Sequence, residues 1–233
     1  MTETLNKFSG KTNLKLNLGC GRNIKPGWVN VDFAERKNKL DIVCDLSKEF
    51  PFEESSCSYI YSEHLIEHLE WLDGRILLDK CFNGLQQGCV LRIVFPDFEE
   101  IFRAYINKDD AFLKNMSSGL DDDDYNYYKR VYEHHEEVRR ERLHNPPPAW
   151  QLSNNQEDRK KVCLRIRQHK YLIDIVDWAV HQFGEHKTLY DAESMKGLLE
   201  EIGFSRVYRS AFDPEMDSGK YYIPSCCYIE AIK

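Results

Sequence analysis

Two glycines and one acid near the start of the chain have the types and spacing of a nucleoside-binding site. Gly19 and Gly21 follow a stretch in which apolar and polar residues alternate, and a second apolar run ends on Asp32. Glycine has no Cβ, so a ligand can lie close against the backbone there, and turned N–H groups attract its carboxylate or phosphate. A carboxylate at the tip of the next strand can accept hydrogen bonds from both ribose hydroxyls. The sequence therefore predicts a strand, a glycine turn, a second strand and a ribose-binding acid.

The spacing of these residues argues against a dinucleotide as the ligand. The dinucleotide fingerprint has a third glycine three positions after the second, and an acid about 20 residues further on. Here Ile24 stands at the third glycine position, and Asp32 comes too early. A nucleoside of another kind is therefore expected at this turn.

The run LNLGCG resembles the first motif of the class I S-adenosylmethionine-dependent methyltransferases. In that family the glycine turn holds the methionine end of the cofactor rather than a pyrophosphate. Pro26 and Gly27 interrupt the segment where most relatives have a full first helix, because proline breaks helices. In this respect the chain is similar to a small bacterial group with LNLGCG followed by PGWVNVD, many members of which occur among glycan-modifying enzymes. The resemblance covers about residues 14–104 and 186–233.

The resemblance implies S-adenosyl-L-methionine as the cofactor, together with a set of residues that hold it. It places Asp32 at the ribose and Asp45 beside the adenine, where a carboxylate can accept from the exocyclic amine. The alternative for each acid is a plain structural role, as a loop cap or a turn acid. The expected cofactor-binding residues are Leu18, Gly19, Cys20, Gly21, Asp32, Phe33, Asp45, Leu46, Ser62, Glu63 and His64.

The stretch SEHLIEHL allows two different chemistries. His64, Glu67 and His68 match the H-x-x-E-H motif of inverted zinc peptidases, in which two histidines one helical turn apart bind the metal. However, the motif is short, eight histidines make a chance match easy, and no later segment offers an evident third ligand in a helical context. We therefore expect no metal. In the methyltransferase interpretation, Ser62, Glu63 and His64 follow the fourth strand and face the cofactor's methyl group.

Three residues are candidates for the general base that a hydroxyl acceptor needs. His64 comes first, because a histidine with a pKa of about 6.5 can take a proton at neutral pH. His186 comes second, since the H-x-x-x-Y pattern before the last helix lies at the mouth of the site in similar enzymes. Asp97, at the end of the fifth strand, could orient a substrate hydroxyl or the base. The alternative for His64 is that it only hydrogen-bonds the cofactor or shapes the pocket.

The rest of the pattern alternates short apolar runs with helical spacing, as in a parallel sheet covered by helices. Strands are expected at about 41–46 and 57–61, and the spacing of Leu65, Leu69 and Leu72 predicts a helix that these residues hold against the sheet. Asp191 and Gly203 are expected to cap the last helix at its two ends. We predict a Rossmann-like, doubly wound α/β fold with a mostly parallel seven-stranded sheet and a shortened first helix.

Regularity is lost between residues 105 and 185, which we interpret as a largely helical insertion after the fifth strand. The segment holds an acidic run at 121–124, a charged helical stretch at 127–144 and a triple proline at 146–148. Its arginines are interpreted as solvated helix faces, with a grip on a substrate phosphate or carboxylate as the alternative. We expect a single domain over residues 1–233, with its core at about 14–104 and 186–233.

Composition limits the partners and the environment. The formal net charge of -7 argues against nucleic acid and anionic lipid as partners. The eight cysteines contain no CxxC pair, and no run reaches the about 18 apolar residues that a membrane helix needs, so a cytoplasmic protein with reduced thiols is expected. The expected activity is O-methylation of a carbohydrate or a related small metabolite. A catalytically silent cofactor-binding domain and a zinc hydrolase are the alternatives, and a homodimer stays open.

Overall fold

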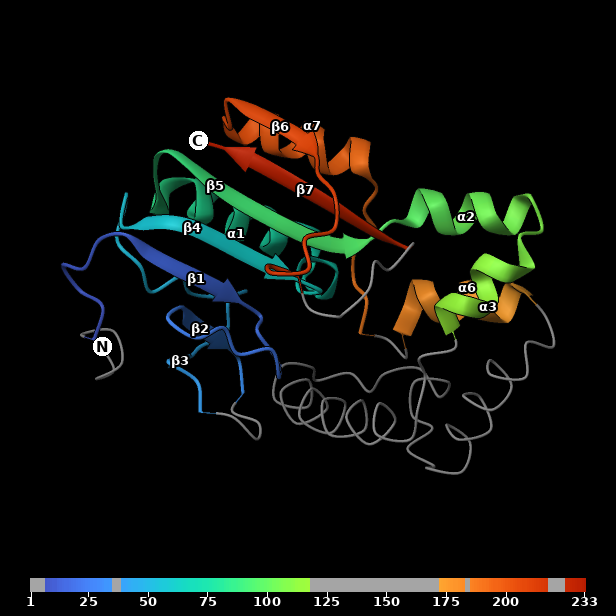
Figure 1. Ribbon diagram of the computed structural model, residues 1–233, viewed down its shortest axis with the longest axis horizontal. Helices are drawn as coiled ribbons and strands as arrows, with labels where there is room; N and C mark the ends of the chain where they lie inside the picture. The colour runs from blue at the N-terminus through green and yellow to red at the C-terminus, as the bar shows by residue number, and fades with distance from the viewer. Residues whose placement is uncertain (1–6, 35–38, 118–171, 183–184, 218–224) are drawn as a thin grey trace, which may run out of the picture. The chain divides into compact units, whose positions relative to one another are not determined.

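The computed structural model describes residues 7–34, 39–117, 172–182, 185–217 and 225–233 (Figure 1). The chain divides into two compact units, one of residues 1–99 and 186–233 and the other of residues 100–185. The predictions for the acidic run, the charged stretch and the arginines of the insertion lie outside the described residues. Among the helices described, none combines the length and the apolar character that crossing a membrane requires.

The first unit is built on one sheet, whose described strands run in the order β3-β2-β1-β4-β5-β7-β6 (Figure 1). Neighbouring strands are parallel except where β7 pairs with β5 and with β6. The seven described strands are β1 Leu14–Leu18, β2 Val29–Asp32, β3 Ile42–Val43, β4 Cys57–Glu63, β5 Leu85–Pro96, β6 Arg206–Arg209 and β7 Cys226–Ile232. This order confirms the predicted Rossmann-like α/β fold with a mostly parallel seven-stranded sheet.

The described residues between β1 and β2 contain no helix, whereas the sequence predicted a shortened one. Residues 19–28 form turns and irregular backbone, and Pro26 and Gly27 lie at the last of these turns. β3 is shorter than predicted, with only Ile42 and Val43 paired to β2, because the chain turns at Asp45. β1 ends at residue 18 and β2 ends at residue 32, and only a short connection links the two strands. Both strand ends therefore lie close to the glycine turn.

The last helix, α7 (Ala192–Ile202), begins and ends where the sequence predicts. The Asp191 carboxylate accepts a hydrogen bond from the Ser194 backbone N–H at 2.7 Å, and the Ser194 side chain accepts from the Asp191 backbone in return. Gly203 follows the helix with a φ of 117°, a left-handed conformation that favours glycine. Met195 and Leu199 on one face of α7 are fully buried in the core.

The prediction that a helix starts at Leu65 is wrong. The segment instead forms the short 3-10 helix η2 (Ile66–His68), then extended backbone at Leu69, and only then α1 (Trp71–Gly84). This break changes which face of the later helix meets the sheet. Leu72 is 60% exposed, against expectation, and Leu77 and Leu78 pack into the core in its place.

The second unit is helical in the part that the structure describes. It holds most of α2 (Phe98–Ile106), which begins at the end of the first unit, together with α3 (Asp110–Ser117) and α6 (Leu172–His181). α3 lies against α6, and Leu113 and Ile175 are fully buried. Helical structure in these segments agrees with the predicted character of the insertion.

A buried arginine joins two strands and a later segment of the first unit. Arg92 of β5 is 1% exposed, and its guanidinium donates to both Asp217 oxygens, at 2.8 and 2.6 Å. It also donates to Glu230 Oε1 of β7 at 2.7 Å and to the Ser210 hydroxyl at 3.0 Å. Two carboxylates therefore neutralise one buried cation, an arrangement that is costly to break by removing one partner.

Candidate functional site

The two glycines after β1 have left-handed backbone but different surroundings. Gly19 has a φ of 63° and Gly21 a φ of 54°. A Cβ at residue 19 would lie 2.9 Å from Leu65 Cβ, whereas a Cβ at residue 21 would meet nothing within 4 Å. Gly19 is therefore required by packing within the chain, and Gly21 leaves open space at the strand end.

Asp32 lies beside this turn and holds it. Asp32 is only 4% exposed, and its Oδ2 atom accepts a hydrogen bond from the Gly21 N–H at 2.8 Å. The second oxygen, Oδ1, has a long contact of 3.4 Å with the Ala34 N–H. One oxygen thus fixes the glycine turn, while the other retains capacity to accept from a ligand hydroxyl. The sequence predicted a ribose role for Asp32, with a structural role as the alternative. The hydrogen bond to Gly21 shows a structural role, and the ribose contact stays a prediction.

Two buried asparagines fix the loop that replaces the first helix. The Asn17 amide of β1 donates to the Asn23 carbonyl at 2.7 Å and to Asn30 Oδ1 of β2 at 2.9 Å. Asn30 Oδ1 also accepts from the Lys25 N–H at 2.8 Å. Sequence reasoning missed this network, although polar residues inside two strands that are buried on both faces were a usable signal.

Asp45 uses its carboxylate within its own turn. Oδ1 accepts from the Ser47 hydroxyl at 2.5 Å, and Oδ2 pairs with Lys48 Nζ at 2.5 Å. Burial opposes the charged form, but these contacts outweigh it and lower the pKa of Asp45 below its ordinary value. Among the other residues expected to bind the cofactor, Leu46 is buried and Phe33 is half-buried. The adenine contact of Asp45 stays a prediction. The structure shows the contacts of Asp45 within its own turn.

The end of β4 brings His64 against a buried acid. His64 has a φ of 50°, and its backbone N–H donates to the Val94 carbonyl at 2.9 Å. Its Nδ1 atom lies 2.9 Å from Glu67 Oε1, and its Nε2 atom lies 3.6 Å from Cys226 Sγ. Because the chain turns here instead of continuing as an α-helix, His64 and His68 are not one helical turn apart. The arrangement needed by an inverted zinc peptidase is therefore not formed by this segment.

Glu67 is 0% exposed and lies among titratable side chains. Burial alone would raise the pKa of Glu67, but the hydrogen bond and charge of His64, with two further histidines nearby, lower it to about 2. For His64, desolvation favours the neutral ring, yet Cys226 and Glu67 outweigh it and raise the pKa well above its ordinary value. The pair is therefore an ionised carboxylate beside a strongly basic imidazole.

The other two candidate bases occupy different surroundings. Asp97 is fully buried, and its Oδ2 atom accepts from Arg209 at 2.9 Å, so that oxygen belongs to an ion pair that joins β5 to β6. His186 is 8% exposed and packs edge-on against Phe98, with ring centroids 6.0 Å apart. His186 lies in the same group of side chains as Glu67 and His68. Among the three candidate bases, His64 has the exposed side chain, at 40%. Ser62 is buried and Glu63 half-buried at the end of β4.

Comparisons with known proteins give structural likenesses only. No family model and no curated protein matches the chain. A methyltransferase of Archaeoglobus fulgidus described as S-adenosylmethionine-dependent is 15% identical, with 98% of this chain and 89% of that chain covered and a TM-score of 0.47. A possible histamine N-methyltransferase of Thermotoga maritima is 12% identical, with 99% and 87% covered and a TM-score of 0.44. A complex of the Haloferax volcanii activator Trm112 with a methyltransferase is 10% identical, with 98% and 86% covered and a TM-score of 0.43. Likenesses at this level of identity do not assign a substrate, which depends on the residues of the site itself.

Proposed function

We propose that the chain is a class I S-adenosylmethionine-dependent methyltransferase that methylates a hydroxyl of a carbohydrate or a related small metabolite. The observation that carries the proposal is the glycine turn after β1 and its hydrogen bond to Asp32 at the end of β2. A turn that leaves open space at Gly21, beside a carboxylate with one available oxygen, fits the amino acid and ribose parts of this cofactor. The substrate class comes from the resemblance to enzymes of glycan modification.

The order of the strands supports the same assignment. β3, β2, β1 and β4 are consecutive neighbours in the sheet, so their carboxyl ends form a row. Ligands of open α/β sheets bind along this edge. Asp45 after β3 would meet the adenine, Asp32 the ribose, and the turn at Gly19 and Gly21 the methionine part. Ser62 and Glu63 at the end of β4, and His64 directly after it, would face the sulfonium methyl group.

S-adenosylmethionine supplies an activated methyl group when it is bound, so the chain's own residues must align the acceptor, exclude water and take its proton. We assign the proton to the neutral form of His64, at Nε2. Because the raised pKa keeps this imidazole protonated to higher pH, turnover should increase as the pH rises through that pKa. His64 has the more accessible side chain, at 40% exposure, against 1% for Asp97, which already pairs with Arg209. Glu67 positions the ring through Nδ1 and increases its basicity. Glu67 is therefore a positioning residue and His64 the catalytic one.

The test is methyl transfer from isotopically labelled S-adenosylmethionine to a panel of saccharides and small hydroxyl compounds. The wild-type chain should label one acceptor class, and His64→Ala should lower turnover about 100-fold to 10,000-fold while cofactor affinity changes little. His181→Ala, at an exposed histidine of α6, serves as the matched control and should keep full turnover. Cofactor binding without transfer to any acceptor would favour a catalytically silent domain, and no cofactor binding would refute the family assignment.

A further inference from the structure

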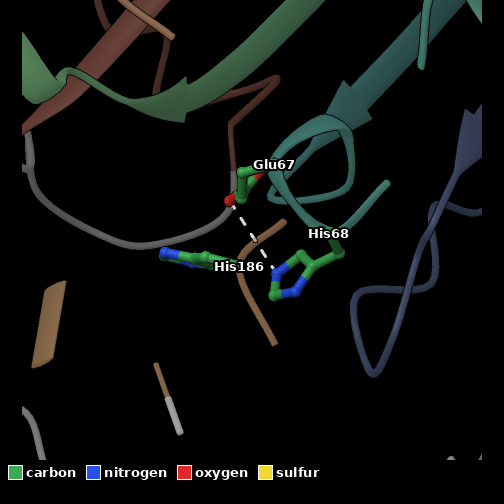
Figure 2. Close-up of side chains that lie close together, drawn as sticks. All are labelled: Glu67, His68 and His186. Carbon is green, nitrogen blue, oxygen red and sulfur yellow. Dashed lines mark ion pairs between the residues drawn. The ribbon is translucent and has the colours of Figure 1, made fainter. Parts of the chain in front are cut away.

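Three side chains from two distant parts of the first unit meet beside the end of β4. Glu67, His68 and His186 each offer one metal-ligand atom, and these atoms all lie within 4.8 Å of one another (Figure 2). Glu67 Oε1 lies 3.9 Å from His68 Nε2, and the two histidine rings have centroids 5.1 Å apart. Figure 2 shows the carboxylate of Glu67 directed towards the His68 ring, with His186 beside both. Two imidazoles and one carboxylate thus converge on one small volume.

Backbone hydrogen bonds fix the two parts of this cluster. The Glu67 carbonyl accepts from the Lys187 N–H at 2.8 Å and from the Thr188 N–H at 3.2 Å. The Thr188 hydroxyl donates to the Leu69 carbonyl at 2.9 Å. These contacts hold the segment that carries His186 directly against η2, the turn that carries Glu67 and His68. The cluster is therefore organised by the fold rather than by long, freely moving side chains.

The two oxygens of Glu67 have different surroundings. Oε1 lies 2.9 Å from His64 Nδ1, whereas Oε2 is buried and has no hydrogen-bond partner among the described residues. A buried carboxylate oxygen without a donor costs free energy, because water that would have solvated it has been removed. A cation bound next to Oε2 would remove that cost.

We propose that Glu67, His68 and His186 bind a divalent transition-metal ion, with Zn²⁺ favoured by the ligand types. Two histidines and one carboxylate are a common three-ligand set for zinc, and they leave a further coordination position open. Zinc with bonds of about 2.0–2.1 Å separates tetrahedral ligand atoms by about 3.3 Å, so modest side-chain rotation must draw the three together. His64 would act on this site only through its hydrogen bond to Glu67, as metal-binding carboxylates are usually supported by such a contact.

This site differs from the H-x-x-E-H motif in the same segment, because His186 takes the place of His64 as a ligand. It also departs from the expectation, drawn from the sequence, that the chain binds no metal. The third ligand that no helical segment supplied is provided by the irregular segment that precedes α7. The inference does not depend on methyl transfer and is tested without measuring activity.

The test is titration of metal-free protein with Zn²⁺ by calorimetry, and with Co²⁺ by visible absorption. Wild type should bind one equivalent saturably, with a cobalt absorption band of imidazole and carboxylate ligation. His68→Ala and His186→Ala should each weaken binding at least tenfold. The control His181→Ala should stay within about threefold of wild type, because its side chain is not a ligand. His64→Ala should weaken binding through the loss of its hydrogen bond to Glu67.

Two results would overturn the proposal. One is no saturable binding of either metal by the wild-type chain. The other is equal metal affinity in wild type, His68→Ala and His186→Ala, which would place the metal elsewhere on a chain with eight histidines and eight cysteines. If His186→Ala fails to fold by circular dichroism, His68→Ala decides alone, because His68 is half-buried and its side chain is 29% exposed.

Discussion

The replacement Asp32→Ala tests the cofactor site most directly. Asp32 Oδ2 already accepts from the Gly21 N–H at 2.8 Å, and the contact of Oδ1 with the Ala34 N–H is long, at 3.4 Å. One oxygen is therefore available for a ribose hydroxyl, and one charge-assisted hydrogen bond is worth about 1.5–3 kcal/mol. Affinity for S-adenosylmethionine and for S-adenosylhomocysteine should fall about tenfold to hundredfold.

Isothermal calorimetry with S-adenosylhomocysteine measures this change. Asp32→Asn keeps an acceptor for the Gly21 N–H but loses the charge, so its affinity should lie between those of wild type and Asp32→Ala. Asp79→Ala removes a partly exposed acid of α1 and serves as the control for overall charge. An unchanged dissociation constant in folded Asp32→Ala would refute the ribose assignment. Tighter binding of a nicotinamide dinucleotide would refute the family assignment as well.

Three further changes test the fold around the site. Arg92→Leu leaves Asp217 charged and buried, so denaturant unfolding should show a loss of about 3–5 kcal/mol. Gly19→Ala should cost about 2–4 kcal/mol in the same measurement, from left-handed strain together with the clash against Leu65. Asp191→Ala should cost about 1 kcal/mol by loss of the helix cap. Because hydrogen bonds from Ser194 lower the pKa of Asp191, its contribution is present above the unfolded pKa and is lost as pH falls through the folded one.

Each of these changes has a matched control. Arg206→Leu replaces an exposed arginine of β6 and should cost less than about 1 kcal/mol. Gly21→Ala has the same backbone strain as Gly19→Ala but no neighbour within 4 Å, so it should cost only about 1–2 kcal/mol. Asp191→Asn can still cap α7 but does not titrate, so its stability should lack the acid-dependent part. Equal losses within any pair would contradict the contact named for it.

The sequence was sufficient where one local rule decides the structure. Alternating apolar residues with a glycine turn predicted β1, β2 and the bend between them, and the capping residues Asp191 and Gly203 predicted both ends of α7. It was insufficient after β4, where the apolar spacing from Leu65 to Leu72 matches one continuous helix. The structure breaks that helix at Leu69, because the backbone of Glu67 is held by two N–H groups from a segment more than a hundred residues away.

Long-range polar contacts account for most of what the sequence did not reveal. One partner of Arg92 is Asp217, and no local pattern connects β5 to that segment. The same holds for His186, whose place beside Glu67 depends on the return of the chain to the sheet. Asp45 shows the converse case, since its turn contacts with Ser47 and Lys48 involve neighbours in the sequence. The contacts of a residue can be predicted from the sequence when its partners are sequence neighbours. They cannot be predicted when the tertiary fold brings the partners together.

The packing of Phe98 against His186 has a consequence for engineering. Their rings lie 6.0 Å apart, so the chain leaves the sheet-bearing unit and returns to it at adjacent points. The Asp97 N–H donates to the Ser225 carbonyl and the Phe98 N–H to the Tyr190 carbonyl, so the point of departure is anchored by contacts within the first unit. Residues 100–185 could therefore be excised and replaced by a short glycine-rich connector with a small closure entropy. The same geometry makes this junction a natural place to exchange one insertion for another.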